Sequence, residues 1–269
     1  MDRIIPGLIM GLGALCLLLF GSASMISLVV IAVAGMALHE LFSILLPQLR
    51  GLALWVTLIV TALPCVGATT GSLHGLIGVF VCSLIGCVLL SFYWFERFKD
   101  EQGHVYVYLG GCFFALTYIS LLMGHLIVIA HLYDGPNWLV VLLTLTVGSD
   151  TGAYYVGKKF GTSKLCPIIS PKKTVAGLIG GLVAGCLMAT VATALLFNHP
   201  VWFRLLPLFV LLIVLGVCGD LAESTLKRSF QIKDSGSILA GHGGILDRLD
   251  SLLLSGPILY YFLYFGVVG

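Results

Sequence analysis

Long apolar runs with few charged residues follow one another along almost the whole chain. They lie near residues 4–20, 24–46, 52–70, 74–94, 105–132, 137–156, 176–197, 201–219 and 251–268. A helix needs about 20 apolar residues to cross the hydrocarbon core of a bilayer. The pattern and a mean hydropathy of +1.10 exclude an ordinary soluble domain. We therefore expect an all-α polytopic integral membrane protein with eight or nine transmembrane helices. Run 105–132 leaves the count open, because it fits one long helix or a helix plus a re-entrant segment.

Basic residues indicate the orientation in the membrane. With nine spans, most Lys and Arg would lie on one side of the membrane, at Arg3, Arg50, 96–99, 157–173 and 227–248. The weakly charged loops near 21–23, 71–73, 133–136 and 198–200 would lie on the other side. Loops rich in Lys and Arg stay in the cytoplasm. We expect a protein of the cell inner (plasma) membrane with a cytoplasmic amino terminus and a polar cavity open to the cytoplasm.

Charge also divides the chain along its length. Residues 1–149 hold four of the fourteen Lys and Arg, and residues 150–250 hold the other ten. We expect 1–147 to be a transmembrane scaffold and 148–269 to be the catalytic part of one integrated membrane domain. The eight cysteines form no CxxC pair and are interpreted as small core residues.

Asp150 lies late in an apolar run, within Gly148–Tyr155. A carboxylate at that depth needs a partner or an aqueous cavity. Two interpretations stay open: a polar set bonded to nearby backbone that bends a helix, or the lining of a cavity reached from the cytoplasmic side.

Five lysines lie between residues 157 and 173 with no acidic residue among them. They could simply anchor the chain at anionic lipid head groups. However, Lys172 and Lys173 stand just before a glycine-rich helix that begins near residue 176. The start of a helix offers unpaired N–H groups and a positive dipole end, which favour a phosphate. Phosphate contact by Lys172 or Lys173 is therefore a second interpretation.

Residues 220–250 carry the densest group of charges. If they are helical, Asp220, Glu223, Ser224 and Lys227 share one face, because they are spaced i, i+3, i+4 and i+7. Asp247 and Asp250 are spaced i, i+3 at the start of the last apolar run. Mg²⁺ binds one or two carboxylates together with phosphate oxygens and water. Asp220, Asp247 and Asp250 around one cavity would make a magnesium–nucleotide site; the alternative is a network of salt bridges between helix ends.

Residues 224–250 resemble the signature of the phosphatidate cytidylyltransferases, or CDP-diacylglycerol synthases. The resemblance is carried by Ser224-Thr-Leu-Lys227-Arg228, Lys233-Asp234-Ser-Gly236 and His242-Gly243-Gly244-Ile-Leu-Asp247-Arg248-Leu-Asp250, and upstream by 149–154, 157–161 and 170–174. It covers about residues 148–251. It implies an enzyme of phospholipid synthesis that transfers CMP from CTP to phosphatidate and releases pyrophosphate. Two positions depart from the family: Ala176 replaces a usual Glu, and Ala240 replaces a usual Pro.

The resemblance also implies roles for individual residues. The catalytic residues would be Asp220, Asp247, Lys227 and Arg228; the metal ligands would be Asp220, Asp247 and Asp250; and the substrate contacts would be Ser170, Lys172, Lys173, Lys233, Asp234, His242, Gly243, Gly244 and Arg248. The cofactor would be Mg²⁺, with a second cation left open. The partners would be CTP, phosphatidate, membrane lipids and a second copy of the chain in a homodimer, without nucleic acid.

Three other functions stay open at this point. A related CTP-dependent enzyme could act on another lipid phosphate, because lipid tails bind apolar surfaces that need no particular sequence. An ion-coupled transporter could use Asp150 and Asp220 within the membrane. The loss of the Glu at position 176 would be the only support for a catalytically inactive scaffold.

Overall fold

The computed structural model describes residues 4–98, 104–197, 202–236 and 243–266, and it is almost entirely helical. This confirms the all-α membrane architecture expected from the apolar runs. The chain divides into two compact units. Unit 1 consists of residues 1–20, 134–233 and 247–269, and unit 2 consists of residues 21–133 and 234–246.

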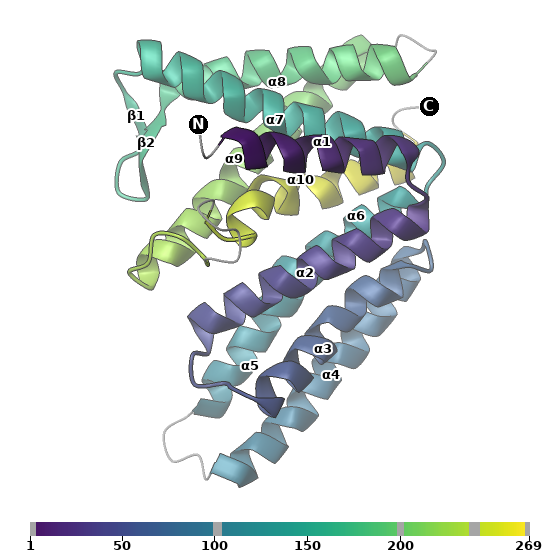
Figure 1. The fold of residues 1–269 in the computed structure, drawn as a ribbon, viewed down its shortest axis with the longest axis vertical. Coiled ribbons are helices and arrows are strands. Elements are labelled where there is room, and N and C mark those ends of the chain that lie inside the picture. Colours follow the sequence, from purple (N-terminus) through teal and green to yellow (C-terminus); the bar gives the residue numbers. More distant parts are fainter. Residues whose placement is uncertain (1–3, 99–103, 198–201, 237–242, 267–269) are drawn as a thin grey trace. The chain divides into compact units, whose positions relative to one another are not determined.

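Unit 2 is a helical bundle. Its elements are α2 (Ala23–Leu45), α3 (Leu52–Ala68), α4 (Leu73–Phe98), α5 (His104–Ala115), the π-helix η1 (Leu116–Leu121) and α6 (Leu122–Ala130). Helix α3 packs against α2, α4 and α6 (Figure 1). Polar pairs join the helices inside the bundle: the Thr57 and Tyr108 hydroxyl oxygens are 3.0 Å apart, and the Ser120 hydroxyl donates to the Thr61 carbonyl oxygen.

The run 105–132 forms one continuous helix with a π-helical turn in its middle. Helix α5, η1 and α6 follow one another without a break, so the re-entrant alternative is wrong. A π-helical turn widens the helix locally and changes which carbonyls are paired.

Unit 1 contains the charged half of the chain. Its elements are α1 (Ile4–Phe20), α7 (Gly135–Phe160), strands β1 (Lys164–Cys166) and β2 (Ser170–Thr174), α8 (Val175–Leu196), α9 (Trp202–Ser229) and α10 (Leu246–Tyr264). The strands pair antiparallel, with Lys164 opposite Thr174. This hairpin replaces the plain loop expected over 157–173. It leads directly into α8, because the Thr174 hydroxyl accepts a hydrogen bond from Gly177 N–H and caps that helix.

Helices α7 and α8 approach closely along a row of glycines. A Cβ atom on Gly152 would lie 2.5 Å from the Gly180 carbonyl oxygen, and one on Gly180 would lie 2.5 Å from a Val156 methyl carbon. Small residues allow such backbone contact between membrane helices. The glycine-rich helix start noted in the sequence is therefore a contact within the chain, and it brings the hairpin and the Asp150 segment together.

We expect Gly180→Val to destabilise unit 1 by about 1–3 kcal/mol or more, because the added side chain overpacks the contact with Val156. Thermal unfolding of the purified protein in detergent measures this effect. Gly78→Val in α4 is the matched control, since a Cβ there meets nothing within 4 Å. Equal unfolding midpoints for the two variants would contradict the close packing of α7 and α8.

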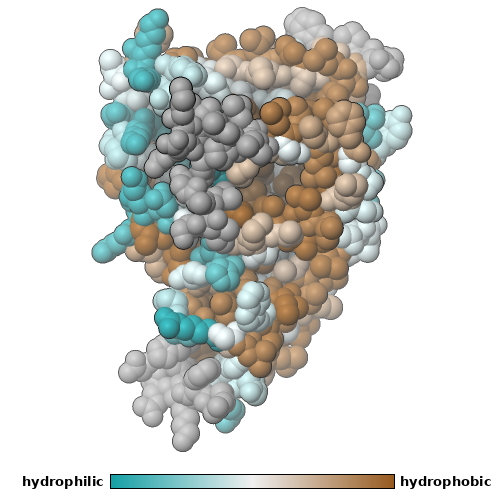
Figure 2. Space-filling view, in the orientation of Figure 1, coloured by the Kyte–Doolittle hydropathy of each residue, from teal (hydrophilic) through white to brown (hydrophobic). Residues whose placement is uncertain are grey.

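The outer surface suits a bilayer. Within the described residues, six helices are long and apolar enough to cross a membrane, and they span Ala23–Leu45, Leu73–Glu96, Val105–Ala130, Gly135–Phe160, Val175–Leu196 and Arg204–Ser229. Two apolar segments, Met10–Phe20 and Leu52–Ala68, are shorter. Figure 2 shows apolar side chains over much of the visible surface. Large apolar residues such as Leu89 and Leu187 are exposed, as expected where lipid is the solvent.

Candidate functional site

Helix α9 presents a polar face at its carboxyl-terminal end. The helix continues past the apolar run to Ser229. The Ser224 hydroxyl donates to Asp220 at 3.3 Å, and Lys227 Nζ lies 3.1 Å from Glu223 Oε1. This confirms the shared face predicted from the spacing.

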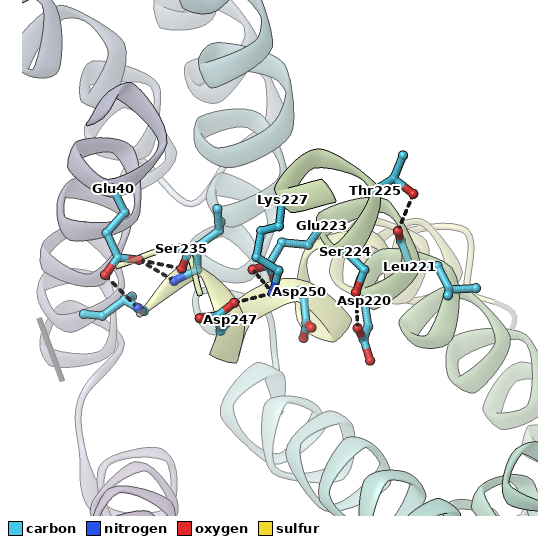
Figure 3. A network of polar contacts seen from close by, with 12 residues as sticks. Glu40, Asp220, Leu221, Glu223, Ser224, Thr225, Lys227, Ser235, Asp247 and Asp250 are labelled. Carbon is cyan, nitrogen blue, oxygen red and sulfur yellow. Dashed lines mark hydrogen bonds and ion pairs between the residues drawn. The ribbon is translucent and has the colours of Figure 1, made fainter. Parts of the chain in front are cut away.

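Lys227 joins this face to the start of α10. Its ammonium group donates to the Asp247 carboxylate as well as pairing with Glu223 (Figure 3). Glu223 is fully buried, and the side chains of Lys227 and Asp247 are only 14% exposed. Charges with so little access to water are costly unless they are paired. In this structure Lys227 therefore neutralises two carboxylates instead of presenting its charge to solvent.

A second ion pair links the hairpin to α9. Lys173 Nζ lies 2.6 Å from Asp220 Oδ2, and the same nitrogen donates at 3.5 Å to the Val217 carbonyl oxygen. The neighbouring Lys172 is exposed. Strand β2 thus holds one lysine fixed against α9 and leaves the next one at the surface.

These side chains surround an open cavity of about 210 Å³. Its lining includes Asp150, Tyr154, Lys172, Lys173, Asp220 and Ser251. Asp150 comes from α7, and its exposed side chain lines this cavity. Arg248 lies within electrostatic reach of Asp150. Cations and carboxylates from α7, β2 and α9 thus line one cavity in unit 1.

The three aspartates expected to bind metal have different partners. Asp220 pairs with Lys173, Asp247 pairs with Lys227, and Asp250 accepts hydrogen bonds from the Ser251 N–H and hydroxyl groups. Within the described residues, no three His, Cys, Asp or Glu side chains form a compact metal-ligating group. A ready-made cage of all three aspartates is therefore not seen there.

A smaller donor set still suits magnesium. Asp220 and Asp250 are within electrostatic reach of each other and of Asp150, and their carboxylates extend to the same side of the network in Figure 3. Mg²⁺ uses one or two protein carboxylates and takes its other oxygens from phosphate and water. The chemistry of these donors fits a hard cation.

The remaining predicted residues differ in their exposure. Arg228, Lys233, Asp234 and Arg248 are exposed, Ser170 is half-buried, Gly243 has a φ of 81°, and Gly244 is buried. His242 lies outside the described residues, and so does Ala240.

Two acidic residues were missing from the predicted site. Glu223 shared the predicted face of α9, but its pairing with Lys227 needed the helix to be folded. Glu40 lies in α2 and is 2% exposed. An isolated acid in a long apolar run is itself a signal, because such a group needs partners.

The sequence is similar to that of known proteins. The sequence model of the cytidylyltransferase family matches residues 1–266. A protein of Bacillus subtilis strain 168 named phosphatidate cytidylyltransferase is 44% identical over 151 residues, which is 55% of this chain and 56% of that protein. Proteins of the same name from Staphylococcus haemolyticus and Staphylococcus aureus are 40% identical over 149 residues, again 55% and 56% of the two chains. The alignments thus span about half the length of these relatives.

Proposed function

Because this chain belongs to the cytidylyltransferase family, we propose that it transfers CMP from CTP to phosphatidate, giving CDP-diacylglycerol and pyrophosphate. The names of its relatives support this reaction. The observation that carries the proposal is the cavity in which Lys173 pairs with Asp220 beside Asp150. Such a cavity, built on apolar helices, suits two anionic substrates of which one is held in a bilayer.

The proposed reaction has a simple balance. A phosphate oxygen of the lipid forms a bond to the α-phosphorus of CTP, and the bond from that phosphorus to the bridging oxygen breaks. Pyrophosphate leaves with the bridging oxygen and its electron pair. A phosphate dianion is already a nucleophile near neutral pH, so no side chain has to remove a proton. Positioning and charge neutralisation then supply the catalysis.

The side chains of unit 1 would share that task. Lys172 is exposed at the cavity and would contact a phosphate directly, whereas Lys173 would hold Asp220 in place. Arg228, Lys233 and Arg248 are exposed cations on the same unit and would hold phosphates. Lys227 would orient Asp247.

We also propose that the reaction uses a magnesium ion. Asp220 and Asp250 would hold the ion, and Asp247 is the third candidate ligand. When bound, Mg²⁺ supplies positive charge next to the phosphate oxygens. We also propose, from the family resemblance, that the protein works as a homodimer.

A transfer assay tests the function. Purified protein in detergent is given CTP labelled at the α-phosphate, Mg²⁺ and phosphatidate, and label in the lipid phase is counted. We expect label with phosphatidate and none after chelation of the metal. Label with a polyprenyl phosphate but not with phosphatidate would assign a different lipid substrate. No label with any lipid phosphate would favour the inactive scaffold.

The cytoplasmic orientation gives a separate prediction. We expect a cysteine at Ser163, in a background without reactive native thiols, to resist an impermeant thiol reagent added to intact cells. Ser163 is exposed and lies between α7 and β1, within the lysine-rich loop. A cysteine at Tyr133, which is 94% exposed and lies in a weakly charged loop, should react and serves as the control. The opposite labelling pattern would reverse the proposed topology. Ser237, an equally informative position in the signature, lies outside the described residues.

A further inference from the structure

Glu40 is a buried carboxylate that the proposed chemistry does not use. It lies in α2, and its side chain accepts hydrogen bonds from Ser235, Ile245 and Leu246 (Figure 3). Ile245 N–H donates to Oε1 at 3.0 Å, Leu246 N–H donates to Oε2 at 3.0 Å, and the Ser235 hydroxyl donates to Oε2 at 3.1 Å. Both oxygens are therefore engaged. Hydrogen bonds to an ionised acceptor are the strong ones, and they offset the cost of burying the charge.

The three donors bracket one segment of the signature. Ser235 precedes Gly236, and Ile245 and Leu246 follow Gly244, so the carboxylate binds two described stretches of the signature, 235–236 and 243–246, here together called the signature loop. Glu40 and the signature loop belong to the same unit. Leu246 is also the first residue of α10, whose opening N–H groups have no partner inside the helix. Glu40 therefore caps α10 from more than two hundred residues away.

The glycines at both ends of the signature loop fit this carboxylate. A Cβ atom on Gly236 would lie 2.7 Å from the Glu40 carboxyl carbon, and one on Gly244 would lie 2.5 Å from Glu40 Oε2. Neither position has room for a side chain while Glu40 is in place. The glycines thus allow the backbone to come close to the Glu40 carboxylate, so that backbone N–H groups can donate to it.

We propose that Glu40 is a positioning residue of the transfer reaction, which anchors the signature loop through Ser235, Ile245 and Leu246. This inference rests on the proposed function. Glu40 is not assigned a contact with substrate or metal, because both of its oxygens are occupied by the loop. The role goes beyond that of passive scaffold expected for residues 1–147.

The test compares Glu40→Gln, Glu40→Asp and a control on the same helix. Gln keeps the shape but turns one acceptor into an N–H₂ donor that faces N–H or O–H donors, so at least one bond is lost. Asp keeps two acceptor oxygens on a shorter side chain. Ser27→Ala is the control, because Ser27 is also 2% exposed on α2 and its hydroxyl donates to the Ala23 carbonyl of its own helix.

Hydrogen exchange provides a readout that needs no substrate. In the wild-type protein the Ile245 and Leu246 amides should be protected. We expect Glu40→Gln to raise their exchange rates by about tenfold or more, with peptides of α3 and α4 unchanged. Wild-type exchange at both amides in this variant would overturn the anchor. The same rise in Ser27→Ala would also overturn it, since general loosening of α2 would then explain the effect.

Transfer kinetics then test the positioning role. We expect Glu40→Gln to lower kcat/KM for CTP by about ten- to a hundredfold, because small misplacements of a reacting group are costly. Glu40→Asp should recover part of this loss, and Ser27→Ala should match the wild type. Faster exchange with unchanged kcat/KM would overturn the positioning role. If the wild-type protein transfers no CMP, the proposed function fails, and the exchange measurement alone decides whether Glu40 anchors the loop.

Discussion

Asp247→Asn is expected to lower CMP transfer by about a hundredfold or more, which corresponds to about 2.7 kcal/mol in transition-state stabilisation. The substitution keeps the shape of the side chain and removes its charge. Asp247 accepts a hydrogen bond from Lys227, and Lys227 also lies 3.1 Å from Glu223. Without the second carboxylate, Lys227 turns toward Glu223 alone, and a candidate ligand for Mg²⁺ is lost. Initial rates over a range of Mg²⁺ concentrations measure both effects.

The folded protein should survive this change, because Lys227 keeps a buried partner in Glu223. Elution on size exclusion and the unfolding midpoint check this point. Glu96→Gln is the control, since it removes the same charge from an exposed position in α4. Transfer at the wild-type rate with an unchanged Mg²⁺ requirement would show that the pair of Lys227 with Asp247 is not needed for transfer and that Asp247 does not bind the metal.

Lys173→Met is the second substitution with a large expected effect. It removes the cation that lies 2.6 Å from Asp220 and leaves Asp220, Asp150 and Asp250 to repel one another and the incoming phosphates. We expect a loss of about thirtyfold or more in kcat/KM, or about 2 kcal/mol. Lys164→Met is the control, because Lys164 is exposed on the other strand of the same hairpin.

A double substitution separates the ion pair from the lysine itself. If Lys173 acts through Asp220, then Asp220→Asn should cost much less in the Lys173→Met protein than in the wild type. Equal costs in the two backgrounds would mean that the two residues act independently, and the assignment of Lys173 as the partner of Asp220 in catalysis would be wrong.

Local spacing predicted the parts of the site that lie on one helix. The pairs Asp220–Ser224 and Glu223–Lys227 are four residues apart, so the helical repeat alone brings them together. The apolar runs likewise predicted the helices, since bilayer thickness requires their length.

Contacts between elements could not be predicted in this way. Lys227 meets Asp247 only because α10 starts beside the end of α9, and Glu40 meets a segment more than two hundred residues away. The hairpin of β1 and β2 was missed because strands of three and five residues leave no readable alternation. The pairs Lys173–Asp220 and Lys227–Asp247 also join different elements, so the spacing along the chain did not indicate them.

The two neighbouring lysines of β2 have unequal consequences for turnover. Ordering a lysine side chain costs up to about 2 kcal/mol of conformational entropy. Lys173 is already held by Asp220, so in the proposed reaction its side chain would need no further ordering in each cycle. Lys172 is exposed, so its side chain would lose conformational entropy each time it binds a phosphate and would regain it on release. In the proposed reaction its contact with phosphate would therefore be weaker, and a weaker contact would favour the departure of pyrophosphate.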